Sequence, residues 1–185
     1  MNVTILNGPP GCGKDTLAKL ICERHPALHK EFKEFLYVEV ADRLGVSVQE
    51  VMDRNANREL KEEPWIEGSS VREWMKHVSE DLIKPTHGDG YFGERAAEEW
   101  YGYHAPIVTS DGGFPEEVIA VCEKFTPNKV VVIQLHREGY DFSNDSRAYI
   151  NTHTVPCRVF YIQLRDGEIE SAYQQIQALR KEFFK

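Results

Sequence analysis

The sequence has no long hydrophobic run, few cysteines and no leader-like start. None of its apolar runs approaches the ~18 residues of a membrane span, and the first run, residues 3–6, is too short for a signal segment. The four cysteines lack the paired spacing of a metal site. We therefore expect reduced thiols and a soluble protein of the cytoplasm, with no membrane partner.

The sequence also lacks an excess of positive charge. It has 22 Lys and Arg against 30 Asp and Glu, which gives a net charge of -8 with histidine neutral. Such a charge repels polyanions, so extended binding to DNA or RNA is disfavoured. Small phosphorylated substrates, bound by a few convergent cations, are compatible with it. No internal repeat or low-complexity tract occurs, and 185 residues fit one domain.

A glycine-rich loop lies between a strand-like apolar run and a helical stretch. It reads Gly8-Pro9-Pro10-Gly11-Cys12-Gly13-Lys14-Asp15-Thr16, which is typical of a phosphate-binding P-loop. Its glycines let backbone N–H groups turn toward phosphate oxygens, and the positive end of the next helix points at the same anion. Lys14 can follow the β- and γ-phosphates during transfer. We predict that the loop binds the phosphates of a nucleotide.

The position of the hydroxyl departs from the common motif. Ser or Thr usually follows the lysine directly, whereas here Asp15 intervenes and Thr16 comes next. The spacing Gly-Lys-x-Thr resembles the nucleoside monophosphate kinase branch of P-loop enzymes. Asp15 either contacts a substrate or only complements the helix dipole.

A second acidic position follows an apolar run over residues 106–110. Asp111 ends this run and precedes two glycines and a helical stretch. Because ligands gather at the carboxyl ends of parallel strands, we predict that Asp111 holds Mg²⁺, directly or through water. A simple turn aspartate is the alternative. Further strands are predicted over residues 29–33, 129–135 and 158–164.

Three arginines are candidate phosphate ligands. Arg137 and Arg147 bracket a polar stretch, as in a lid that closes positive charge over transferring phosphates. Arg72 follows Ser70, which forms a capping box with Glu73 and places Arg72 in the first turn of a helix. A cation is disfavoured by the dipole there, so we predict a bound phosphate. Ordinary surface arginines and a surface ion pair are the alternatives.

Aromatic residues near this region are candidate substrate contacts. Trp65 ends the charged stretch 58–65, which is interpreted as an exposed connector or, alternatively, as a functional loop. Phe92 begins a helix and could stack on a base, although aromatic residues at such positions usually belong to the core. Residues 84–90 are rich in turn formers and predict a loop.

Together these residues resemble the bacteriophage deoxynucleoside monophosphate kinase family, a P-loop group related to adenylate kinase. The resemblance spans most of the chain. The motifs that carry the resemblance are Gly-Lys-Asp-Thr at 13–16, Arg-Glu-Leu-Lys-Glu at 58–62, Ser-x-Arg-Glu at 70–73, Ser110-Asp111 followed by Phe114 and Glu117, and Asp-Gly-Glu-Ile-Glu at 166–170. One departure is that such proteins often carry an arginine two residues after the aspartate, where this chain has Gly113.

The resemblance implies a three-layer α/β/α P-loop NTPase fold with a five-stranded, mostly parallel sheet. It implies a single kinase domain over residues 1–185, with a monophosphate-binding helical region at about 34–105 and a lid at about 137–150. The location would be cytoplasmic, in the host if the protein is phage-encoded. The oligomeric state stays open, with a homodimer as one alternative.

The implied activity is transfer of the γ-phosphoryl group of ATP, with Mg²⁺, to a deoxynucleoside 5′-monophosphate, giving the diphosphate. A P-loop kinase acting on a hydroxymethylated base in DNA and a non-catalytic nucleotide-binding module stay open as alternatives. The expected roles are catalysis by Lys14, Arg137 and Arg147, nucleotide binding by Gly8, Gly11, Cys12, Gly13, Lys14, Asp15 and Thr16, acceptor binding by Arg72, Asp15, Trp65 and Phe92, and metal binding by Thr16 and Asp111.

Overall fold

A computed structural model describes residues 2–143 and 145–183 of the chain. The chain divides into two compact units. The sheet unit comprises Met1–Phe32 and Gly93–Lys185, and the helical unit is the insertion Lys33–Phe92. Residues 93–105, which the sequence analysis assigned to the helical region, thus belong to the sheet unit. Each unit is described by itself.

The sheet unit is built on five parallel strands, as predicted. They are connected in the spatial order β2-β5-β1-β6-β7, and every neighbouring pair is parallel. The second strand begins one residue earlier and ends four residues earlier than the predicted stretch 29–33, because only Leu28 and His29 pair with β5. The bounds are β1 (Val3–Asn7), β2 (Leu28–His29), β5 (Ile107–Gly112), β6 (Val130–Arg137) and β7 (Arg158–Leu164).

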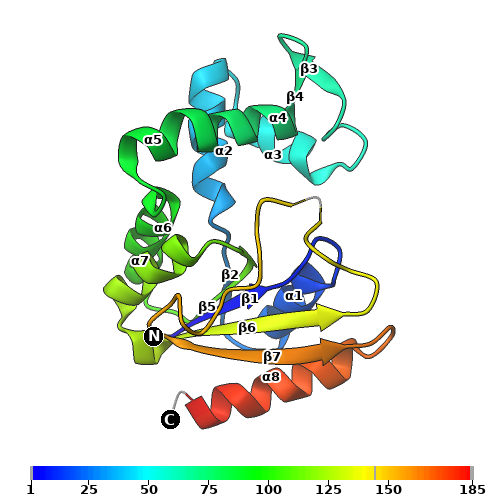
Figure 1. Cartoon of the computed structure of the whole chain (residues 1–185), viewed down its shortest axis with the longest axis vertical. Coiled ribbons are helices and arrows are strands. Elements are labelled where there is room, and N and C mark those ends of the chain that lie inside the picture. The colour runs from blue at the N-terminus through cyan, green and yellow to red at the C-terminus, as the bar shows by residue number, and fades with distance from the viewer. Residues whose placement is uncertain (1, 144, 184–185) are drawn as a thin grey trace. The chain divides into compact units, whose positions relative to one another are not determined.

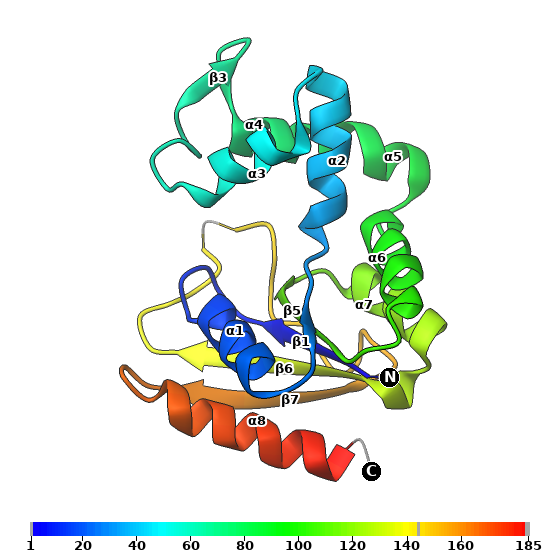
Figure 2. The ribbon, with the colours of Figure 1, turned by 180° about the vertical axis from the view of Figure 1, so that it is seen from behind.

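Helices cover both faces of this sheet (Figures 1 and 2). On one face, α1 (Lys14–Arg24) and α8 (Ile169–Phe183) bury their apolar residues against β1, β6 and β7 in one core cluster. On the other face lie α7 (Pro115–Phe125) and α6 (Tyr91–Gly102), whose Trp100 is fully buried. The unit therefore has the predicted three layers, because strands buried on both faces need helices on both.

The topology brings the glycine loop after β1 and the ends of β5 and β6 together at one edge of the sheet. β1 lies between β5 and β6, so the loop after Asn7 begins beside the ends of both neighbours. A register irregularity between Ile5 and Asn7 brings Asn7 opposite Gly112 of β5. Because parallel strands end at the same edge, the glycine loop and the end of β5 are neighbours there.

The helical unit begins with α2 (Lys33–Leu44) and α3 (Val48–Ala56). A two-stranded antiparallel hairpin follows, formed by β3 (Pro64–Ile66) and β4 (Ser69–Ser70). The end of the stretch interpreted as a connector is therefore a short strand.

The predicted capping box of α4 (Val71–Lys76) is confirmed, because Ser70 and Glu73 exchange both bonds of the motif. The chain then continues as a π-helix (His77–Ile83) into α5 (Lys84–His87). The prediction of a loop from residue 84 is wrong for these first four residues. Pro85 lies in the first turn of α5, directly after the π-helix, where the hydrogen-bond pattern of the helix changes. Among the described residues, no helix has the length and hydropathy needed to cross a membrane.

The contact between α6 and α7 predicts a position that tolerates no side chain. A Cβ on Gly93 would lie 2.5 Å from Cα of Glu117, a backbone atom that cannot move alone. We expect Gly93→Ala to lower the free energy of unfolding by about 1–3 kcal/mol, as overpacking does. The matched control is Gly102→Ala in the same helix, where nothing lies within 4 Å of the added Cβ. Chemical denaturation measures both, and equal stability of the two variants would contradict the prediction.

Candidate functional site

The glycine loop after β1 leaves the start of α1 open. Gly13 is the N-cap of α1 with φ 110°, and no side chain caps the helix there. Gly11 also has a positive φ of 76°. Since glycine alone adopts such angles without strain, these two residues turn the backbone around the helix end. The N–H groups of the first turn and the positive end of the dipole are thus available to an anion.

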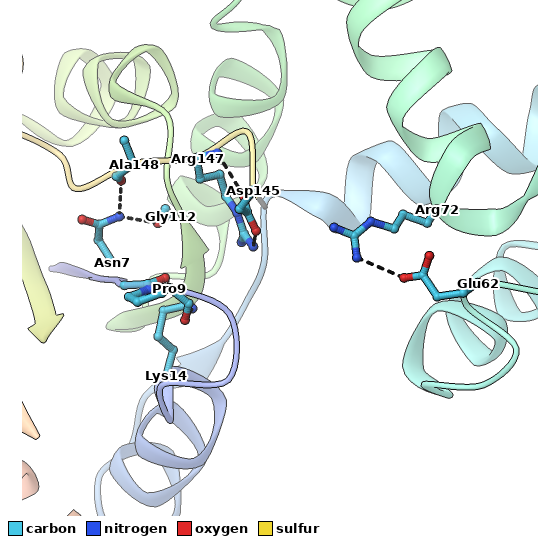
Figure 3. Close-up of polar contacts among 10 residues, drawn as sticks. Asn7, Pro9, Lys14, Glu62, Arg72, Gly112, Asp145, Arg147 and Ala148 are labelled. Atoms are coloured by element: carbon cyan, nitrogen blue, oxygen red, sulfur yellow. Dashed lines mark hydrogen bonds and ion pairs between the residues drawn. The ribbon is translucent and has the colours of Figure 1, made fainter. Parts of the chain in front are cut away.

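Lys14 points back into its own loop. Its Nζ donates to the carbonyl oxygens of Gly8 at 2.7 Å and of Pro9 at 2.8 Å (Figure 3), and the residue is buried. Burial lowers the pKa of Lys14, and the positive charge of nearby Arg147 lowers it further. The ammonium group is therefore held at the loop, where phosphate oxygens can replace the two carbonyls as acceptors.

A cavity of about 150 Å³ opens beside the start of α1. Arg137 lies at its wall, where Nε and Nη2 donate to Asp166 at 2.9 and 2.7 Å. The guanidinium also lies 4.5 Å from the ring centre of Tyr140. The cavity therefore combines apolar walls with cations and a hydroxyl; its lining residues are Cys12, Gly13, Thr16, Arg137, Leu164, Arg165, Gly167 and Ile169.

Asp111 lies at the end of β5 and is 9% exposed. Its Oδ1 accepts hydrogen bonds from the Thr109 hydroxyl at 2.7 Å and from the Phe32 N–H at 3.1 Å. The described residues contain no group of three or more His, Cys, Asp or Glu that could hold a metal. One oriented carboxylate fits Mg²⁺ all the same, because this ion is usually held by one or two carboxylates together with substrate phosphates. Thr16, the other predicted ligand, lines the cavity, whereas Asp111 is not among its lining residues.

Arg147 joins this group from a distant part of the chain (Figure 3). Its Nε and Nη2 donate to the two carboxylate oxygens of Asp145 at 2.7 and 2.6 Å. These bonds raise the pKa of Arg147, and so do the nearby carboxylates of Asp111 and Glu117, while burial acts in the opposite sense. Arg147 is thus close enough to Lys14 and to Asp111 to interact electrostatically with each of them, which the spacing in sequence does not indicate.

Asn7 is a residue of this site that the sequence analysis missed. It is fully buried, and its Nδ2 donates to the carbonyl oxygens of Gly112 at 3.0 Å and Ala148 at 2.9 Å. Its Oδ1 accepts from the Ile150 N–H at 2.9 Å. The available signal was an amide at the end of an otherwise apolar strand, directly before the loop, since buried polar groups need partners.

The segment predicted as a lid, residues 137–150, begins with the last residue of β6 and is irregular in the rest of its described part; its residue Asn144 lies outside the described residues. Hydrogen bonds join its second half to the strands β1 and β6. Beside the Asn7 bonds, Gln134 donates to the carbonyl oxygen of Ile150 at 2.8 Å. The Tyr149 hydroxyl donates to the carbonyl oxygen of Leu135 at 3.2 Å. Arg147 therefore belongs to a stretch of backbone that is held to the sheet by hydrogen bonds.

Three of the predicted acceptor contacts lie in the helical unit. Arg72 donates to Glu62 at 3.0 Å in an ion pair whose side chains are both at least half exposed, and its binding of a phosphate stays a prediction (Figure 3). The ring of Trp65 lies 4.9 Å from the guanidinium of Arg54. Phe92 is 3% exposed, which favours the alternative of a core residue. The fourth candidate, Asp15, is exposed in the first turn of α1.

No protein-family model matches the sequence, and no curated protein matches it significantly. A kinase candidate from Chloroflexus aurantiacus superposes with a TM-score of 0.51 at 14% identity, over 98% of this chain and 97% of that one. The chain has a P-loop α/β/α fold. A shikimate kinase from Bacteroides thetaiotaomicron (TM-score 0.44, 15% identity, 97% and 98% covered) and a gluconokinase from Sinorhizobium meliloti (0.44, 13%, 99% and 95%) are too dissimilar to support more.

The loop geometry predicts that Gly11 is needed for phosphate binding. A Cβ there would meet the Tyr140 ring at 3.2 Å and would strain a backbone with positive φ. We expect Gly11→Ala to weaken binding of inorganic tripolyphosphate, measured by calorimetry, by about 10-fold or more, because one to two kcal/mol of strain distorts the cradle. The control is Gly45→Ala, where φ is 66° and nothing lies within 4 Å. Equal weakening by both variants would refute a specific role of the loop.

Proposed function

We propose that the protein is an ATP-dependent kinase that phosphorylates a small acceptor, specifically a deoxynucleoside 5′-monophosphate. The observation that carries this proposal is an uncapped helix N-terminus with the buried Lys14 held at its loop, together with Arg147, which interacts electrostatically with both Lys14 and Asp111. An open helix end and a lysine suit the phosphates of ATP, a carboxylate suits Mg²⁺, and an arginine suits charge that moves between phosphates.

The proposed donor site follows from this arrangement. The loop from Gly8 to Gly13 binds the phosphates of ATP, and Lys14 exchanges its two carbonyl acceptors for β- and γ-oxygens. The adenine ring enters the cavity beside the start of α1, where Arg165 offers a planar cation for stacking. Asp111 and Thr16 would hold Mg²⁺ together with the phosphates, and the ion would supply neutralisation of developing charge.

The proposed reaction needs no general base. An oxygen of the acceptor's 5′-phosphate, already ionised at neutral pH, bonds to the γ-phosphorus as the bond to the β-bridging oxygen breaks. ADP leaves with that oxygen and its electron pair, and the acceptor becomes the diphosphate. Alignment and charge neutralisation by Lys14, Arg137 and Arg147 then carry the rate.

The proposed acceptor site uses the helical unit. Arg72 exchanges Glu62 for the 5′-phosphate, a step that an exposed pair permits because such pairs contribute little net free energy. A guanidinium can bind that phosphate through two parallel hydrogen bonds. Asp15 and Trp65 remain proposed contacts of the acceptor, and Phe92 remains one only if its buried ring becomes accessible on binding.

A coupled assay of ADP release, run with each common deoxynucleotide and with duplex DNA containing hydroxymethylated bases, tests the proposal. ADP release with a deoxynucleotide supports it. Release with DNA alone would instead establish a kinase of modified bases. ATP binding without release for any acceptor would establish a non-catalytic nucleotide-binding module.

Lys14→Ala is expected to lower kcat by about 100-fold or more while leaving the fold intact, because a cation that faces the transferring phosphate acts in the transition state. The control is Lys19→Ala, an exposed lysine of the same helix. A folded Lys14→Ala protein with normal kcat would refute the kinase proposal.

Arg72→Ala is expected to raise KM for the deoxynucleotide by about 10- to 100-fold with little change in KM for ATP, because a charge-assisted bidentate contact is lost. Arg72→Lys restores only part of the affinity, since a point charge cannot reproduce the planar fork. Arg43→Ala, which removes another exposed arginine of the helical unit, serves as the control. If Arg72→Ala changes neither constant, the acceptor phosphate binds elsewhere.

A further inference from the structure

We propose that Asn7 and Gly113 are positioning residues that hold Arg147 at the phosphate site, so that this cation is fixed by the sheet and not carried by a mobile lid. The inference rests on the proposed function for the role of Arg147. It adds two residues that touch no substrate and that act only through the placement of a third.

Gly113 supplies the space that Arg147 occupies. A Cβ on Gly113 would lie 2.5 Å from Cγ, 2.5 Å from Cδ and 2.7 Å from Cβ of Arg147, far inside van der Waals contact. Gly113 is not among the glycines with positive φ, so its backbone does not require glycine. The residue that follows the strand acid by two positions is therefore glycine because the stem of Arg147 lies against its backbone.

Asn7 holds the backbone on both sides of this contact. Its amide donates to Gly112, the residue before Gly113, and to Ala148, the residue after Arg147. It also accepts from the Ile150 N–H. One fully buried side chain thus ties the end of β5 to the returning segment and fixes the distance between Gly113 and Arg147 (Figure 3).

Asp145 completes the placement at the far end of the side chain. Its carboxylate is only 8% exposed and binds the guanidinium through both oxygens. The stem, the backbone and the head group of Arg147 are therefore each held by a different residue. A cation that is already in place needs no reorganisation when charge develops on a phosphate, which is the condition for large electrostatic stabilisation.

A double-mutant cycle tests the inference: Gly113→Ala and Arg147→Ala are made singly and together. We expect Gly113→Ala to lower kcat by about 10-fold or more with a smaller change in KM for ATP, as loss of a transition-state contact does. In the Arg147→Ala protein, adding Gly113→Ala should change kcat by less than about twofold, because the residue acts only through Arg147. Equal losses in both backgrounds would overturn the inference.

Asn7→Asp provides a second, independent variant. Its carboxylate still accepts from the Ile150 N–H but cannot donate to the two carbonyls, so kcat should fall. Because Asn7 acts through Arg147, this fall should disappear in the Arg147→Ala protein. Gln134→Leu is the matched control, because Gln134 holds the same segment at Ile150 without reaching Ala148. A loss of kcat with Gln134→Leu as large as with Asn7→Asp would overturn the specific role of Asn7. If Asn7→Asp does not fold, the Gly113 cycle decides.

Calorimetric titration with ATP and Mg²⁺ separates this inference from the proposed function. If the wild-type protein binds ATP but transfers no phosphoryl group, the proposed function fails and the same cycle is measured on Kd. Non-additive changes in Kd would then support the positioning roles, whereas additive changes would overturn them. If the protein is a kinase but the effects of the two substitutions on both kcat and Kd are additive, the positioning roles are overturned and the proposed function stands.

Discussion

The buried amide of Asn7 is the interaction on which the candidate site depends. It lies one residue before the phosphate loop and satisfies three backbone groups from two other segments. Removing one partner from such a network leaves buried groups without hydrogen bonds, which costs more than the bond itself contributes. The geometry of the loop, of the end of β5 and of the segment bearing Arg147 is therefore set together.

The two arginines of the predicted lid have different surroundings. The arginine side chains are similarly exposed, 23% for Arg137 and 25% for Arg147, but their partners differ: the side chain of Asp166 is 87% exposed and that of Asp145 is 8% exposed. A pair with an exposed carboxylate is weak and exchanges readily, while breaking a pair with a buried carboxylate is costly because it leaves that charge without compensation. Arg137 is thus suited to leave its carboxylate for a nucleotide, and Arg147 is suited to stay in place.

Much of the fold could be predicted from local patterns. The strands β5, β6 and β7 were predicted from short local runs of residues, and the start of α4 was predicted from the pairing of Ser70 with Glu73, because both signals depend on neighbouring residues only. The predicted loop after residue 84 failed because Pro85 falls in a first turn, which depends on where the preceding π-helix ends. Phe92 shows the same limit, since its burial is decided by packing and not by its place at a helix start.

The sequence by itself determined the phosphate loop, since glycine at 11 and 13 with lysine at 14 meets a requirement confined to a few adjacent residues. Only the tertiary structure decided how the cations around it are arranged. The distant charged neighbours of Lys14, Asp145 and Arg147, come from a segment more than 130 residues away, and the reason for glycine at 113 is a side chain 34 positions later. Spacing in sequence carries no information about such contacts, because the order of parallel strands in the sheet, and not the chain, brings these residues together.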